Sequence, residues 1–113
     1  MSVTCAKANT QTFTSTKQEL AQEKDFAAMS KALSHPARVR IIKTLLTLDN
    51  LGGCLNSDLV FELGLAQSTV SEHLRILKQT GFITAESIPP KMCYQVNRSK
   101  LDSYSTLFSD IFS

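Results

Sequence analysis

The chain has 113 residues, of which 42% are hydrophobic and 19% charged, and its formal net charge is +2. This length suits one globular domain, and no stretch approaches the roughly 20 apolar residues that a membrane-spanning helix needs. The N-terminus lacks the basic and then apolar pattern of a secretion signal, so we expect a cytoplasmic protein. Three cysteines spread along the chain are an odd count, which predicts free thiols, ligands or buried side chains and not a disulfide framework.

The N-terminal segment differs in composition from the rest. Residues 1–15 are rich in Thr, Ser, Ala and Asn, which predicts a flexible arm. Residues 16–113 are expected to form one domain. At its start, apolar residues recur with the period of a helix, at Phe26, Met29 and Leu33.

Three further helices are predicted between residues 36 and 81. The segment 36–48 begins with a proline, which suits the first turn of a helix. Its expected buried residues are Val39, Ile42, Leu45 and Leu46. A short helix from residue 56 or 57 to 63 ends before Gly64, and a longer helix, 67–81, ends with Gly81 as its C-terminal cap. The buried line of this longer helix consists of Val70, Leu74 and Leu77.

The remaining residues predict a hairpin and a last helix. The segments 82–88 and 92–97 are short strands of β-branched and aromatic residues, with a turn at "PPK" between them. The segment 98–112 has the apolar spacing of a helix. The fold class is therefore mainly α with a small β-hairpin wing (α+β), a winged helix-turn-helix with four helices, two strands and a fifth helix in chain order.

The two helices joined by a tight turn at Gly64 have the arrangement of a helix-turn-helix. A helix that enters the major groove needs short polar side chains that reach base edges and cations that neutralise phosphates. The polar side chains are Gln67, Ser68, Thr69 and Ser71, and the cations are Arg75 and Lys78. Lys91, at the tip of the hairpin, is expected to contact a neighbouring phosphate or the minor groove. Glu72 lies on the same face and would repel phosphate unless it reads a cytosine amino group.

The segments "LSHPARVRIIKTLL", "LAQSTVSEHLRILKQTGFI" and "CYQVN" resemble the ArsR/SmtB repressors, winged-helix dimers that leave their operators when a metal or metalloid binds. The resemblance covers roughly residues 20–112, and the recognition-helix block is its most specific part. It implies that the residues facing DNA are Gln67, Ser68, Thr69, Ser71 and His73, with Arg38 and Arg40 as the arginines of the second helix. The wing departs from the family pattern, because "IPPK" replaces a turn that often contains Gly and Arg.

A homodimer is expected through the first and fifth helices. The fifth helix carries a wider apolar stripe than a terminal helix usually buries on a domain this small. Its apolar residues are Leu101, Tyr104, Leu107, Phe108, Ile111 and Phe112. The family resemblance implies the same interface, and twofold symmetry would place the recognition helices about 34 Å apart, one turn of DNA.

The family's thiol site is a pair of cysteines at the start of the third helix. This chain matches the first with Cys54 and has Asn56 at the second. Because trivalent arsenic and antimony usually take two or three thiolates, we expect a regulatory As(III) or Sb(III) on Cys54 with Cys93 or Cys5. Helix-terminal amides near Cys54 would lower the pKa of its thiol. The alternatives are strand packing for Cys93 and no role for Cys5.

Two other kinds of site are not expected. Zinc- and nickel-type members of the family pair Asp and His on the fifth helix, which here has Asp102 and Asp110 but no histidine. An enzyme is not expected either, because no oxyanion loop or acidic third member accompanies the cysteines and histidines.

The sequence thus predicts a homodimeric repressor that binds double-stranded operator DNA, needs no cofactor to fold, and is released by a thiophilic ligand. Two alternatives stay open. One is a thiol-based redox-responsive repressor in which Cys54 is oxidised. The other is a winged-helix protein-interaction module without a metal ligand.

Overall fold

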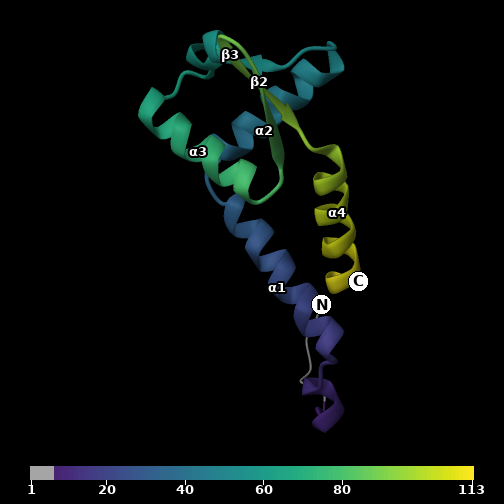
Figure 1. Cartoon of the computed structure of the whole chain (residues 1–113). Coiled ribbons are helices and arrows are strands. Elements are labelled where there is room, and N and C mark those ends of the chain that lie inside the picture. The colour runs from purple at the N-terminus through teal and green to yellow at the C-terminus, as the bar shows by residue number, and fades with distance from the viewer. Residues whose placement is uncertain (1–6) are drawn as a thin grey trace, which may run out of the picture.

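The computed structural model describes residues 7–113, with residues 58 and 59 described by their backbone alone. The elements in chain order, drawn in Figure 1, are the 3₁₀-helix η1 (Thr10–Phe13), α1 (Lys17–Ala32), α2 (Pro36–Asn50), β1 (Leu55–Asn56), the 3₁₀-helix η2 (Ser57–Leu63), α3 (Gln67–Gln79), β2 (Ile83–Ile88), β3 (Lys91–Val96) and α4 (Arg98–Phe112). Among the described residues, no helix is both long enough and apolar enough to cross a membrane.

This order confirms the predicted winged helix-turn-helix, with two differences around residue 56. The third helix is the 3₁₀-helix η2, a form that proteins use for short helical pieces. Ahead of it lies the two-residue strand β1, which pairs antiparallel with β3 and makes the sheet three-stranded in the order β1-β3-β2. The first helix of the helix-turn-helix therefore begins directly at an edge strand of the sheet that carries the wing.

The helix ends follow from local side chains. Thr16 and Glu19 form a capping box at the start of α1, with reciprocal bonds of 3.1 and 3.0 Å. His35 caps α2, and Pro36 occupies its first position. At the end of α3, Gly81 adopts a φ of +88°, which a residue with a β-carbon rarely tolerates, and so turns the chain into β2.

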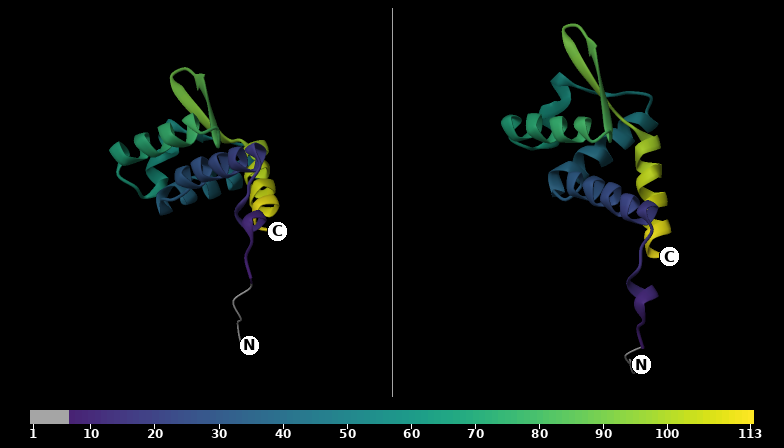
Figure 2. Two further views of the ribbon diagram at one scale, coloured as in Figure 1. Left: turned by 90° about the horizontal axis from the view of Figure 1, so that it is seen from below. Right: turned by 60° about the horizontal axis from the view of Figure 1, so that its bottom comes forward.

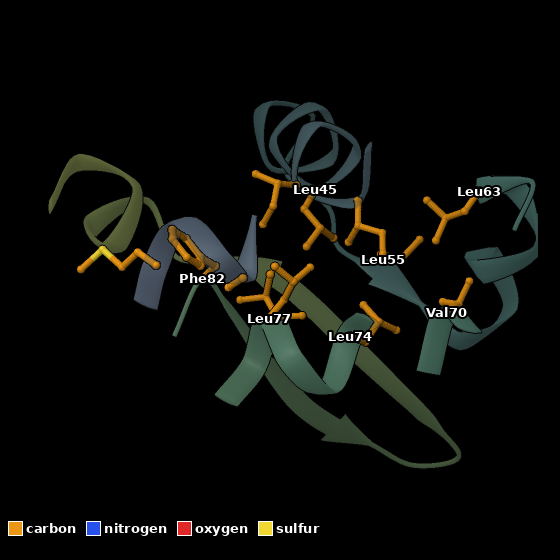
Figure 3. Packing of buried hydrophobic residues seen from close by; sticks show 12 residues of the cluster. Leu45, Leu55, Leu63, Val70, Leu74, Leu77 and Phe82 are labelled. Carbon is orange, nitrogen blue, oxygen red and sulfur yellow. The ribbon is translucent and has the colours of Figure 1, made fainter. Parts of the chain in front are cut away.

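The core lies where α2, α3 and η2 meet the sheet (Figure 3). The largest side chains with less than 2% exposure are Phe82, Ile41, Leu45, Leu55, Leu77, Ile83 and Val70. The expectation that Val39 is buried is wrong, because it is 45% exposed whereas Ile41 is 0% exposed. Two residues correspond to about 200° around a helix, so Val39 lies on the face of α2 opposite the one that meets the core.

The helices α1 and α4 lie side by side and extend away from this core (Figures 1 and 2). The ring of Phe26 stacks on Tyr104 with centroids 5.0 Å apart, and Ser30 and Tyr104 share a hydrogen bond of 2.9 Å. Even so, no residue of α4 is fully buried, and Phe108 and Phe112 are 53% and 63% exposed. The pair of helices therefore keeps an apolar surface that this chain alone does not cover.

Candidate nucleic-acid interface

The outer face of α3 is polar and exposed, whereas its inner face is anchored in the core by Val70, Leu74 and Leu77. The predicted DNA-contacting residues on the exposed face are Gln67, Ser68, Thr69, Ser71, Arg75 and Lys78. The Thr69 hydroxyl donates to the carbonyl of Ala66 at 2.7 Å, which ties it to the first turn of the helix. The helix thus presents short polar groups in its first turn or two and cations towards its C-terminus.

Arg75 does not extend freely from this face. Its guanidinium donates to both carboxylate oxygens of Glu72, at 2.6 and 3.0 Å, and to the side-chain oxygen of Gln79 at 3.1 Å. The hydrogen bond from Arg75 holds the pKa of Glu72 below its usual value, so this carboxylate stays ionised. Without DNA, Glu72 therefore offsets part of the charge that Arg75 would offer to a phosphate, and since both side chains are exposed the pair is free to rearrange.

The wing, which we define as the β2–β3 hairpin, lies against the recognition helix α3. Its strands pair antiparallel out to Ile88 and Lys91, which places Lys91 at the tip, where it is exposed. A shallow groove with a volume of about 220 Å³ lies between α3 and the wing. Its lining residues are Ser71, Leu74, Arg75, Lys78, Ala85, Met92 and Tyr94. Polar and cationic groups of α3 thus share one groove with the inner side of the wing.

The second-helix arginines have different surroundings. Arg40 is exposed, donates weakly to the carbonyl of Leu63 at 3.5 Å, and lines an open hollow on the outer face of α2 together with Lys43. Lys43, three residues further along the same helix face, was not among the predicted DNA contacts. Its spacing from Arg40 is the signal that could have identified it.

Arg38 and His73 contact each other inside the molecule. The Nε of Arg38 donates to Nδ1 of His73 at 3.1 Å, and its Nη1 donates to the carbonyls of Ala32 and Lys31 at 3.2 and 3.4 Å. His73 is 8% exposed, so its side chain does not lie on the outer face of α3 with the other predicted contacts. The periodicity of α3 contains this signal, because position 73 lies next to the buried Leu74 and three residues from the buried Val70.

Cys54 and Cys93 are joined by a disulfide; their Cα atoms are 5.8 Å apart, and the two residues are separated by 39 in sequence. The expectation that the chain has no disulfide is therefore wrong for this pair. Cys54 is half-buried in the loop before β1, and Cys93 is buried in β3. Cys5, the other candidate ligand, lies outside the described residues. Among the side chains that the structure describes, no group of three or more His, Cys, Asp or Glu could hold a metal ion.

Pairing of β1 with β3 is what brings the two cysteines together. Asn56, the residue at the family's second thiol position, pairs in register with Cys93, and Leu55 is anchored in the core. The hydroxyl of Ser57 accepts a hydrogen bond from the backbone N–H of Met92 at 3.1 Å, which continues the connection into η2. A strand of two residues has almost no sequence signature, and this is why the pairing was not predicted.

Comparisons with known proteins point to one family. Residues 35–85 match the family model described as "Bacterial regulatory protein, arsR family". The chain is 35% identical over 71 residues to the uncharacterized HTH-type transcriptional regulator Rv0081 of Mycobacterium tuberculosis, covering 62% of this chain and 59% of that protein. It is 38% identical over 64 residues to the HTH-type transcriptional regulator CmtR of the same organism, covering 57% and 51%. The chain thus spans about half to three fifths of the length of these relatives.

The fold has a solved counterpart. An ArsR-like transcriptional regulator from Rhodococcus sp. RHA1 superposes with a TM-score of 0.65 at 19% identity, over 80% of this chain and 82% of that one. The matched sequence segment contains all of α2, β1, η2 and α3 and the beginning of β2, and so it includes the helix-turn-helix. The matched family consists of regulators and not of enzymes, in agreement with the prediction. Over residues 35–85 the chain is thus similar to the ArsR family of helix-turn-helix transcriptional regulators.

Proposed function

We propose that this chain is a transcriptional repressor that binds operator DNA as a homodimer, and that the state of Cys54 and Cys93 sets its operator affinity. The observation that carries DNA binding is the exposed polar face of α3 beside the wing. In the major groove, the N-terminal side chains of α3 reach base edges, while Lys78, Lys91 and Arg40 neutralise phosphates. A protein-interaction module would not need this coincidence of short polar groups and cations.

The apolar surface of α1 and α4 supports the homodimer. Phe108 and Phe112 are more than half exposed and lie beside Phe26, with ring centroids 6.0 and 5.6 Å from it. Aromatic rings bury large apolar areas, so a second copy docked on this surface gains considerable hydrophobic stabilisation. The same twofold arrangement gives a palindromic operator two recognition helices.

Replacing Phe108 by Glu is expected to convert the dimer into a monomer, because a carboxylate cannot be buried in an apolar interface without a partner. Light scattering after size exclusion measures the mass directly, against 12.5 kDa for one chain. Phe61→Glu, which changes an exposed Phe on η2, is the matched control and should leave the dimer intact. A wild-type chain that is monomeric at tens of micromolar concentration would contradict the dimer.

The disulfide supports a redox switch. It links the loop before β1 to the middle of β3, next to Met92 and Tyr94, which line the groove between the wing and α3. We propose that the reduced protein binds the operator and that the disulfide restrains the wing in a position that fits DNA poorly. Oxidation then acts through the difference in affinity between the two states.

The oxidation balances with hydrogen peroxide as the oxidant. One thiolate attacks a peroxide oxygen, which breaks the O–O bond and gives a sulfenic acid and hydroxide. The thiolate of the second cysteine then attacks that sulfur, forms the S–S bond and expels a second hydroxide. With the two protons of the original thiols, both hydroxides become water, so two electrons have passed from the sulfurs to peroxide.

Fluorescence anisotropy on labelled duplexes tiled over the DNA upstream of its own gene tests both parts of the proposal. The reduced protein should bind one duplex, and peroxide should weaken binding at least about tenfold, or about 1.4 kcal/mol of coupling. Cys54→Ser and Cys93→Ser should each bind but no longer respond, whereas Cys5→Ser should respond like the wild type. Equal affinity before and after oxidation would overturn the switch, and absence of binding to every duplex would leave the protein-interaction module as the function.

The same pair favours a second candidate, a trivalent metalloid. As(III) or Sb(III) binds two or three thiolates. Pairing of β1 with β3 brings the Cα atoms of Cys54 and Cys93 to 5.8 Å from each other. Redox control ranks first because the two cysteines are joined as a disulfide, whereas the described residues place no third ligand beside them. Arsenite added to the reduced protein in the same assay separates the two candidates: release by arsenite but not by peroxide, lost in Cys54→Ser, would assign the metalloid.

A further inference from the structure

We propose that His73 is a positioning residue for DNA binding that works only as a neutral imidazole, so that acid weakens operator binding. The inference rests on the proposed DNA-binding function. His73 belongs to α3 and stands between Ser71 and Arg75 in sequence, yet it is buried and cannot reach DNA itself. What it contacts instead is the machinery that holds α3 in place.

The contacts of His73 join three helices. Its Nδ1 accepts a hydrogen bond from Nε of Arg38 on α2 at 3.1 Å. Arg38 in turn donates through Nη1 to the carbonyls of Ala32 and Lys31, at 3.2 and 3.4 Å, in the last turn of α1. One guanidinium thus ties the recognition helix to α1 and α2, and His73 is the acceptor on the recognition helix.

The neighbouring histidine uses the same ring nitrogen as an acceptor. Nδ1 of His35 accepts the backbone N–H of Ala37 at 3.0 Å and so caps α2, and the two imidazole rings lie 4.5 Å apart. Both histidines use Nδ1 as an acceptor, which an imidazolium cannot do because both of its nitrogens carry protons. Protonation of His73 therefore removes the bond to Arg38 and places a cation directly beside that guanidinium.

The electrostatic surroundings of His73 also favour its neutral form. The titratable groups facing it are His35 and Arg38 at the start of α2 and Glu72 from its own helix, while the last turn of α1 contributes backbone carbonyls that accept from Arg38. Burial lowers the pKa of His73 below its ordinary value of 6.5, the charges of His35 and Arg38 lower it further, and Glu72 opposes them. The stabilisation that the Arg38–His73 hydrogen bond gives to the position of α3 is complete above pH 6.5 and is lost as the pH falls through the lowered pKa. Acid therefore favours states in which α3 is released from Arg38.

Anisotropy of the reduced protein on its operator between pH 7.5 and 5.5, at constant ionic strength, tests the proposal. We expect the Kd to rise over this range, by less than about tenfold, because one linked proton whose pKa lies below 6.5 allows no more. His73→Asn keeps an acceptor near the position of Nδ1 but does not titrate, so its Kd should respond much less to acid than the Kd of the wild type does. His35→Asn is the matched control, because asparagine is a good helix cap and leaves the His73 side chain in the protein.

The sign of the pH effect separates positioning from simple charge. Added positive charge alone would strengthen DNA binding in acid, so tighter binding at pH 5.5 would overturn the proposal, as would equal pH profiles for the wild type and His73→Asn. The chain has only two histidines, so an NMR titration of the DNA-free protein assigns each directly. If no duplex is bound at any pH, the proposed DNA-binding function is itself refuted. The positioning contact is then tested by this titration alone, and a His73 that titrates at or above pH 6.5 would refute it.

Discussion

Replacing Phe82 by Ala is expected to lower the free energy of unfolding by about 3–5 kcal/mol, the range for a fully buried aromatic side chain. Phe82 is 0% exposed and lies where α3, β2 and α4 converge (Figure 3). Its backbone N–H donates to the carbonyl of Leu77, and its carbonyl accepts from the N–H of Asn97, the cap of α4. Its ring also meets Tyr104 edge-on, with centroids 6.2 Å apart. Loss of the ring opens a cavity between α3, β2 and α4, and these elements cannot move close enough to fill it.

Urea unfolding followed by far-UV circular dichroism measures this loss. A domain of this size is stable by only about 5–15 kcal/mol, so the variant should lie near the limit of folding. Phe61→Ala makes the same chemical change at a side chain that is 69% exposed and should stay within about 0.5 kcal/mol of the wild type. Equal losses in the two variants would contradict the position of Phe82 in the core.

Replacing Ser71 by Glu is expected to weaken operator binding about a hundredfold, or about 2.7 kcal/mol. Ser71 is exposed on α3 and lines the groove next to Arg75, Lys78 and the wing, where DNA is expected to lie. A carboxylate at this position faces the phosphates and fills the space that a short hydroxyl leaves open for base edges. The fold should be unaffected, because the site is exposed and Glu is a good helix former.

Gln79→Glu is the matched control for this variant. It adds the same charge to the same helix, also at an exposed site, but about 12 Å further along the axis. We expect its Kd to change less than about tenfold, because a carboxylate at position 79 does not occupy the space that DNA is expected to fill. Similar losses for both variants, with the same dependence on salt, would mean that only net charge matters and that α3 does not read bases with its N-terminal half.

Much of this architecture is encoded locally. Periodicity located α3 and its buried line of Val70, Leu74 and Leu77, and the left-handed Gly81 ends that helix as predicted. Such features depend on residues within about one helical turn of each other, whose geometry chain stereochemistry restricts strongly. The exposed polar face of α3, and with it the candidate DNA interface, follows from the same period.

Contacts between distant segments were decided only when the chain folded. Nothing near Cys54 in sequence indicates that β1 will pair with β3 and bring Cys93 to it across 39 positions. Likewise, periodicity places His73 beside the buried Val70 and Leu74, but only the packing of α3 on the start of α2 brought its Nδ1 to Arg38. The physical reason is common to both: helix and turn preferences act between near neighbours, whereas a disulfide or a buried hydrogen bond needs atoms from separate elements within a few ångströms of each other. Sequence patterns therefore determined which surfaces this protein has, and tertiary packing determined which of its thiols and histidines can act together.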